Sequence, residues 1–259
     1  MARGYYTRTV LAAWDWRDGK LTQRWIFDSQ DGTEGNLAYR GQGNHGISVA
    51  DVDGDGRDEI IYGAAVIDDN GKGLYSTGRG HGDAQHTSDL DPSRPGLETY
   101  SIHENPRHEH GINLRDARTG ELYWSKPSPD IGRGLAADID PRHPGAEYWA
   151  TGDGLDSVWN NKGEMVSVRK PRSVNFAIWW DGDPLREILN SNTISKWDWH
   201  TSVDVPLLVA HGTTSNNGTK STPALSADLF GDWREEVIWR TNDNTELRIY
   251  TTTTPTTHR

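Results

Sequence analysis

A short acidic loop, Asp51–Glu59, is the part of this sequence that most directly predicts chemistry. It reads Asp-x-Asp-x-Asp-Gly-x-x-Glu, and its candidate ligands are Asp51, Asp53, Asp55 and Glu59. Carboxylates on alternate residues converge as the chain turns at Gly56, and the glutamate can complete the set. Hard oxygen ligands in this number favour calcium. An EF-hand is excluded because its twelfth position is Tyr62 rather than glutamate and no helices flank it.

Acidic loops of this kind recur along the chain, about every 40 to 50 residues. The four later copies again place aspartates before a closing glutamate. Each departs from the first in detail, so weaker or empty metal sites are expected among them. An ordinary exposed turn explains one such loop equally well, but five aligned copies favour metal binding. The candidate calcium ligands of the later loops are Asp89, Asp91, Glu98, Asp138, Asp140, Glu147, Asp181, Asp183, Glu187, Asp228, Asp232 and Glu236.

The charge balance agrees with bound cations and excludes several classes of function. The formal net charge is −11, and five divalent ions would bring it to about −1. No basic stripe is present that could neutralise phosphates, which argues against nucleic-acid binding. No apolar run is long enough to span a membrane. The absence of cysteine excludes disulfides and thiolate sites.

Four short polar clusters outside the acidic loops supply candidates for acid–base chemistry. They are Gly41–His45, Gly80–His86, Gly132–Gly134 and Ser215–Lys220. A histidine beside glycine can equally be a turn residue, and Asn217-Gly-Thr is formally an N-glycosylation acceptor. All four clusters precede the first strand of a repeat, and this shared position favours one common site.

The elements that must position these residues are predicted to be strands. The chain has 28 glycines and 12 tryptophans, with turn residues throughout, which is typical of an all-β protein. Strands are expected at 47–50 and 59–62, and hairpins at 69–71, 118–120 and 160–163. Four strands in each repeat predict the blades of a β-propeller, and the lack of a 3.6-residue pattern argues against helical repeats. The predicted single domain, 1–259, contains five blades and a partial one, at roughly 5–40, 41–80, 81–130, 131–170, 171–215 and 216–259.

Several stretches resemble rhamnogalacturonan lyases of polysaccharide lyase family 11, in the same order along nearly the whole chain. They are Arg3–Arg8, Gly41–His45, Gly73–Gly78, His81–Asp83, Asp89–Glu98, Ser173–Trp180, Asn217–Lys220 and Gly231–Glu236. The resemblance implies an eight-bladed, calcium-bearing propeller that cleaves the rhamnose–galacturonate backbone of pectin by β-elimination. Family members are longer, so this chain is expected to be an internal portion of such a protein, of extracellular origin.

The resemblance also assigns roles. It matches the catalytic channel of the family with His45, His81, Arg133 and Lys220. Asn44, Asn217, Gly218 and Thr219 are assigned to substrate binding, and Trp233 could stack on a sugar face. Bound calcium would let an acidic protein hold a polyanion, here the plant cell-wall polysaccharide rhamnogalacturonan I.

β-Elimination at a uronate requires removal of the C5 proton beside the carboxylate. Lys220 is the first candidate for the base. Arg133 would neutralise the carboxylate, and a role as the base is its alternative. His45 and His81 would position the sugar or protonate the leaving oxygen of rhamnose.

Two other interpretations stay open. A non-catalytic calcium-binding propeller could bind polysaccharide or protein. A chain that lacks blades could also close its ring by pairing with a second copy, which predicts self-association.

Overall fold

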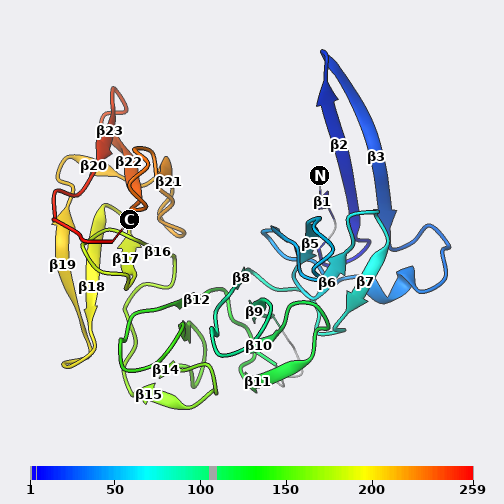
Figure 1. Ribbon diagram of the computed structural model, residues 1–259, viewed down its shortest axis with the longest axis horizontal. Coiled ribbons are helices and arrows are strands. Elements are labelled where there is room, and N and C mark those ends of the chain that lie inside the picture. Colours follow the sequence, from blue (N-terminus) through cyan, green and yellow to red (C-terminus); the bar gives the residue numbers. More distant parts are fainter. Residues whose placement is uncertain (1, 4, 105–109, 259) are drawn as a thin grey trace. The chain divides into compact units, whose positions relative to one another are not determined.

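The structure, a computed structural model, describes residues 2–3, 5–104 and 110–258 (Figure 1). Its regular structure there is a series of antiparallel β-sheets and a single 3-10 turn, η1 (Asn36–Tyr39). The chain forms two compact units, residues 1–134 with 150–155, and residues 135–149 with 156–259. The all-β prediction is therefore confirmed.

The first unit holds one three-stranded sheet and two four-stranded sheets. The three-stranded sheet consists of β1 (Ala2–Arg3), β2 (Val10–Arg17) and β3 (Lys20–Asp28). The next contains β4 (Ser48–Ala50), β5 (Glu59–Tyr62), β6 (Ala65–Ile67) and β7 (Gly73–Ser76). The third contains β8 (Ala84–Ser88), β9 (Glu98–Ile102), β10 (Ile112–Asp116) and β11 (Leu122–Lys126).

Three further four-stranded sheets follow along the chain. One is β12 (Gly134–Ala137), β13 (Glu147–Ala150), β14 (Val158–Trp159) and β15 (Met165–Ser167). The next is β16 (Phe176–Ile178), β17 (Glu187–Asn190), β18 (Thr193–Asp198) and β19 (Val203–Val209). In the last, β22 (Glu236–Thr241) pairs with β20 (Thr213–Thr214), β21 (Leu225–Ala227) and β23 (Leu247–Tyr250).

Every acidic loop occupies the same place in its sheet. It connects β4 with β5, β8 with β9, β12 with β13, β16 with β17 and β21 with β22, and in each case the closing glutamate is the first residue of the second strand. The predicted hairpins at 69–71, 118–120 and 160–163 lie between β6 and β7, β10 and β11, and β14 and β15. The four-stranded repeats are thus confirmed, whereas a closed ring and its number of blades stay predictions.

Large aromatic residues fill the cores of the sheets. In the second unit, Trp149 and Trp197 pack in one hydrophobic cluster, and Trp180 and Trp239 pack in another. The buried indole N–H groups of Trp149 and Trp239 each donate to a backbone carbonyl, which removes the cost of burying them. Among the described residues, no helix has the length and apolar character needed to cross a membrane.

Candidate functional site

The first acidic loop folds around its own carboxylates. Asp51 accepts hydrogen bonds from the backbone N–H groups of Gly54 and Gly56, at 2.7 and 2.9 Å. Asp53 and Asp55 each accept one from the residue two positions later. Gly54 and Gly56 have φ values of 82° and 87°, a left-handed conformation that glycine adopts readily. The turn therefore orients the acidic side chains without help from another element.

The buried carboxylate of Glu59 is the strongest indication that this loop binds a cation. One carboxylate oxygen accepts the N–H of Val52 at 2.9 Å, while the other, Oε1, is buried and has no hydrogen-bond partner in the described chain. Burial raises the pKa of Glu59 above its usual range. Oxygens of Asp51, Asp53 and Glu59 lie within 4.8 Å of one another. An orphaned carboxylate oxygen beside two aspartates fits a hard divalent cation such as calcium.

In the second and third loops, an arginine side chain already pairs with one of the aspartates. Arg94 donates to Asp91 at 2.8 Å, and Arg142 donates to Asp140 at 2.5 Å. The closing glutamates of these loops resemble Glu59. Glu98 and Glu147 each accept hydrogen bonds from two backbone N–H groups. The Oε1 atom of each is buried and has no hydrogen-bond partner in the described chain. Burial raises the pKa of Glu147 to about 9.

In the fourth loop, a lysine from the next hairpin lies among the acidic groups. Lys196 of β18 donates to Asp181 at 2.5 Å, to Asp183 at 2.7 Å and to Glu187 at 2.9 Å. The same three carboxylates are close enough together to hold a metal ion. The ammonium group therefore occupies the position that a cation would take.

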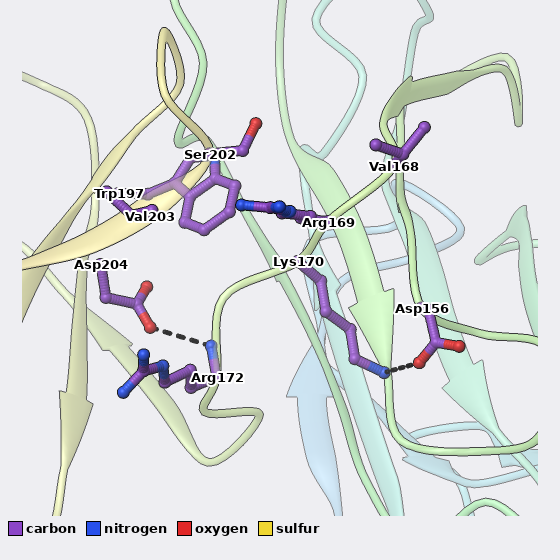
Figure 2. A pocket seen from close by; sticks show the side chains of 9 residues that line it. All are labelled: Asp156, Val168, Arg169, Lys170, Arg172, Trp197, Ser202, Val203 and Asp204. Atoms are coloured by element: carbon purple, nitrogen blue, oxygen red, sulfur yellow. Dashed lines mark hydrogen bonds and ion pairs between the residues drawn. The ribbon is translucent and has the colours of Figure 1, made fainter.

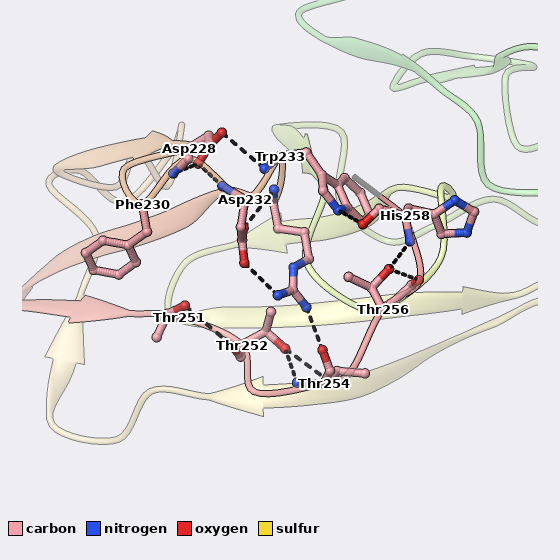
Figure 3. A network of polar contacts seen from close by, with 12 residues as sticks. Asp228, Phe230, Asp232, Trp233, Thr251, Thr252, Thr254, Thr256 and His258 are labelled. Carbon is pink, nitrogen blue, oxygen red and sulfur yellow. Dashed lines mark hydrogen bonds and ion pairs between the residues drawn. The ribbon is translucent and has the colours of Figure 1, made fainter.

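The fifth loop relies on arginine and threonine side chains (Figure 3). Arg234 donates to Asp232 at 2.6 Å, and Thr251 donates to the Oε1 of Glu236 at 3.0 Å. The indole of Trp233 donates to the carbonyl oxygen of His258, so the last described residues lie against the proposed stacking platform. Calcium binding stays a prediction at the first loop and at the four later ones, including the sites at Asp89, Asp138 and Asp228.

The two predicted histidines lie together in the first unit. The Nε2 atoms of His45 and His81 are 3.1 and 3.3 Å from Oδ1 of Asp83. Nδ1 of His81 lies 2.8 Å from the carbonyl oxygen of Gly43, which can only accept, so this nitrogen carries the hydrogen. In a neutral ring, Nε2 of His81 would then present a lone pair to the Asp83 carboxylate. His45, His81 and Asp83 also lie close enough together to hold a metal ion.

Close backbone contact holds this histidine group in place. Asn44 and Gly82 form a parallel β-bridge, and β4 and β8 lie side by side. A Cβ on Gly82 would collide with the carbonyl oxygen of Ile102, and one on Gly43 would collide with the ring of Tyr62. Glycine at both positions is therefore a condition for bringing the two histidines together.

Residues that the sequence analysis did not assign complete this site. Asp83 links the histidines, and the rings of Tyr5 and Tyr6 contact His81 at centroid distances of 4.8 and 4.2 Å. The Tyr6 hydroxyl donates to Glu104 at 3.2 Å. The available signal was proximity in sequence, because Asp83 follows His81 by two positions and the tyrosines lie in one of the family-like stretches.

The polar cluster Gly132–Gly134, which contains Arg133, lies beside the carboxylate of Asp83. A Cβ on Gly132 would lie 3.7 Å from Oδ2 of Asp83, and the carbonyl oxygen of Gly134 lies 3.0 Å from Nε2 of His86. The carbonyl oxygen of Arg133 accepts the N–H of Thr151 at 2.9 Å. Three of the four predicted polar clusters therefore meet within the first unit.

The fourth cluster is a well-braced loop of the second unit. Asn217 accepts the N–H of Lys220 at 2.8 Å and donates to Thr222 at 3.0 Å, while Ser215 donates to the carbonyl oxygen of Asn217 at 2.8 Å. Lys220 itself is exposed, as are Asn217, Gly218 and Thr219. The four candidate catalytic residues are thus divided between the two units, and their roles stay predictions.

Comparison with known proteins gives a consistent result. The model of the "Rhamnogalacturonan lyase family 11, C-terminal domain" matches residues 1–259. The rhamnogalacturonan endolyase YesW of Bacillus subtilis is 56% identical over 260 residues, which cover 100% of this chain and 41% of YesW. The rhamnogalacturonan exolyase YesX of the same organism is 54% identical over 272 residues, covering 100% of this chain and 44% of YesX.

Solved structures agree. The crystal structure of YesW superimposes with a TM-score of 0.95 at 56% identity, over 100% of this chain and 43% of that one. A rhamnogalacturonan lyase of Bacillus licheniformis gives a TM-score of 0.95 at 60% identity, again over 100% of this chain and 43% of that one. The chain therefore spans about two fifths of the length of these relatives.

Proposed function

Because the chain belongs to rhamnogalacturonan lyase family 11, we propose that it contributes to the cleavage of rhamnogalacturonan by β-elimination. Its relatives are named as an endolyase and an exolyase of this polysaccharide. The observation that carries the proposal is the convergence of His45, His81 and the Arg133 segment around Asp83.

In the proposed reaction, a base removes the C5 proton of galacturonate, a C4–C5 double bond forms and the bond from C4 to the leaving oxygen breaks. Lys220, exposed on its braced loop, is the proposed base. Arg133 would pair with the uronate carboxylate and stabilise the charge that develops as C5 loses its proton. A protonated His45 or His81 would return a proton to the leaving oxygen of rhamnose.

The proposal includes a calcium ion bound at the first acidic loop. Asp51, Asp53 and Glu59 would hold the ion, with Asp55 close by on the same turn. The bound ion would supply positive charge that offsets the acidic surface and helps it to retain a polyanion. We further propose that the repeated sheets are blades of a propeller and that the protein is extracellular in origin.

The direct test is incubation with rhamnogalacturonan I while the absorbance of unsaturated uronides is recorded, with and without a chelator. We expect Lys220→Ala to lower the rate about 100-fold or more, because a positioned base contributes roughly that factor. Lys162→Ala changes an exposed lysine of a hairpin turn and should retain the wild-type rate. Full activity in Lys220→Ala would remove the proposed base.

A folded chain that binds the polysaccharide without producing unsaturated ends would instead support the non-catalytic, polysaccharide-binding alternative. Sedimentation analysis of the same sample would test the predicted self-association.

A further inference from the structure

A cavity of about 350 Å³ lies in the second unit, and none of the candidate catalytic or metal-binding residues lines it (Figure 2). It opens between the segment that follows β15 and the hairpin of β18 and β19. Its volume is within the range of small-molecule sites in proteins. Its lining residues are Asp156, Val168, Arg169, Lys170, Arg172, Trp197, Ser202, Val203 and Asp204.

The lining is cationic in a chain that is strongly acidic overall. Arg169, Lys170 and Arg172 lie within four consecutive residues, although the net charge of the chain is −11. Lys170 is paired loosely with Asp156, at 3.8 Å. In the part of the chain that the structure describes, the guanidinium groups of Arg169 and Arg172 form no ion pair and no hydrogen bond with a carboxylate. Figure 2 shows both arginine side chains extending to the same side of their segment, toward Trp197 and Asp204.

Hydrogen bonds fix the basic segment against the hairpin. Ser167 donates to the carbonyl oxygen of Arg169 at 2.6 Å, and its hydroxyl lies 3.1 Å from that of Ser202. The N–H of Arg172 donates to Oδ2 of Asp204 at 2.9 Å. The two guanidiniums therefore project from a braced backbone, which lowers the entropy that a ligand would have to remove.

One wall of the cavity presents an acceptor that needs a donor. Oδ1 of Asp204 is buried and has no hydrogen-bond partner in the described chain, and burial raises the pKa of this carboxyl. A ligand hydroxyl would supply that donor. Inorganic phosphate carries up to two negative charges, so it would meet more repulsion from Asp156 and Asp204 than a uronate, which carries one. Val168 and Val203 add exposed apolar surface that suits the C–H face of a sugar ring.

We propose that this cavity is a second binding site for a uronate, with the sugar carboxylate on Arg169 and Arg172 and a hydroxyl on Asp204. Planar guanidinium groups are well matched to a carboxylate, and charge-assisted hydrogen bonds are the strong ones. The choice of a uronate among hydroxylated anions rests on the proposed function, because rhamnogalacturonan carries one in each repeat. The site would hold another part of the acidic polysaccharide rather than the bond that is cleaved.

The experiment is a titration of the Lys220→Ala protein with D-galacturonate, followed by chemical shifts of backbone amides. We expect millimolar binding that shifts the amides of residues 168–172 and 202–204. Arg169→Gln combined with Arg172→Gln should raise the Kd at least tenfold, and the corresponding lysine variants should give an intermediate value because they retain the charge but lose the planar fork. Arg118→Gln, an exposed arginine outside the cavity, is the matched control.

Comparison ligands decide the chemical class. D-Galactose, which lacks the carboxylate, should bind at least tenfold more weakly, and inorganic phosphate should bind more weakly than galacturonate. Tighter binding of phosphate, equal binding of galactose or indifference to the double variant would overturn the proposal. Rhamnogalacturonan cleavage is measured separately on the wild type. Arginine-dependent uronate binding without cleavage would defeat only the proposed function, and cleavage with arginine-independent binding would defeat only this site.

Discussion

The first and fourth acidic loops share one backbone frame but differ in the source of their positive charge. In both, aspartates at alternate positions precede a glutamate that begins the second strand of the sheet and accepts a backbone N–H. In the fourth loop, Lys196 contacts all three carboxylates. In the first, the only arginine of the loop, Arg57, pairs instead with Asp69 at 3.0 Å. The same frame can therefore be completed by a lysine or left open for an exchangeable ion.

Because of this difference, we expect the stability of only one of the two loops to depend on a metal ion. A covalently attached ammonium is always present, so the fourth loop should fold without calcium. An open carboxylate set stabilises the folded state only when its ion is bound. We therefore expect the chain to contain a metal-independent and a metal-dependent version of one loop, and stability measurements would show whether the two loops differ in this way.

The largest expected effect comes from Lys196→Met. This change removes the ammonium group that contacts Glu187, which is fully buried, and the two aspartates beside it. Removing one partner of a buried charged group costs roughly 3 kcal/mol, which urea unfolding in calcium-free buffer would measure. Lys162→Met, at an exposed turn, should change stability by less than about 0.5 kcal/mol. Added calcium should restore much of the loss, because the fourth loop would then resemble the first. Unchanged stability in Lys196→Met would contradict the role given to the lysine.

The metal itself should give the next largest effect. Calcium at about 100 times its Kd should stabilise the wild-type protein by about 2.7 kcal/mol per site, measured as a rise in the urea midpoint. Glu59→Gln should lose most of the share that belongs to the first loop, because Oε1 of Glu59 is the buried orphan. Glu121→Gln, on an exposed side chain, serves as the control. An equal response to calcium in wild type and Glu59→Gln would show that the ion binds elsewhere.

These loops also show what sequence can and cannot predict. Their acidic spacing is local, so the candidate ligands, the turn and the following strand could be inferred from consecutive residues. Arg94, Arg142 and Arg234 were equally close in sequence, two or three positions after an aspartate, and were a signal that went unused. Lys196 could not be found in that way, since its contact depends on the pairing of β17 with β18 and on the face to which its side chain points.

The histidine group illustrates the same limit. Repeat spacing predicted that His45 and His81 occupy equivalent positions, and the parallel bridge between Asn44 and Gly82 brings their segments together. The link through Asp83 depends on side-chain geometry that spacing does not specify. Family resemblance, rather than any local pattern, supplied the role of Lys220.

The dependence on pH should differ with metal content. Burial raises the pKa of Glu59 above its usual value near 4.3, so the folded metal-free protein keeps a proton that the unfolded chain releases. The stability due to that proton is fully present below pH 4 and is lost as the pH rises through the folded pKa. Unfolding in metal-free buffer should therefore show a stability that falls as the pH rises above the usual glutamate range, and Glu59 should contribute to this slope. Calcium should flatten this slope, because it favours the ionised form. Glu59→Gln should weaken the slope without metal, and an unchanged slope would exclude Glu59 as its source.

The smallest expected effect distinguishes two aspartates of the first loop. Asp53 belongs to the group of carboxylates within 4.8 Å of one another, and Asp55 does not, although sequence spacing treats both as ligands. The fourth loop has only two aspartates, Asp181 and Asp183, before its glutamate, which suggests that the third aspartate is not essential to the frame. Asp53→Asn should therefore raise the Kd for calcium at least tenfold, measured by titration calorimetry.

Asp55→Asn should change that Kd by no more than about twofold, because the asparagine carbonyl can still accept the N–H of Arg57 and preserve the turn. A loss of affinity as large as that of Asp53→Asn would mean that the loop contracts around its ion to recruit Asp55. In that case the first loop would depart from the fourth in its backbone as well as in its source of charge, and the shared frame would hold only without metal.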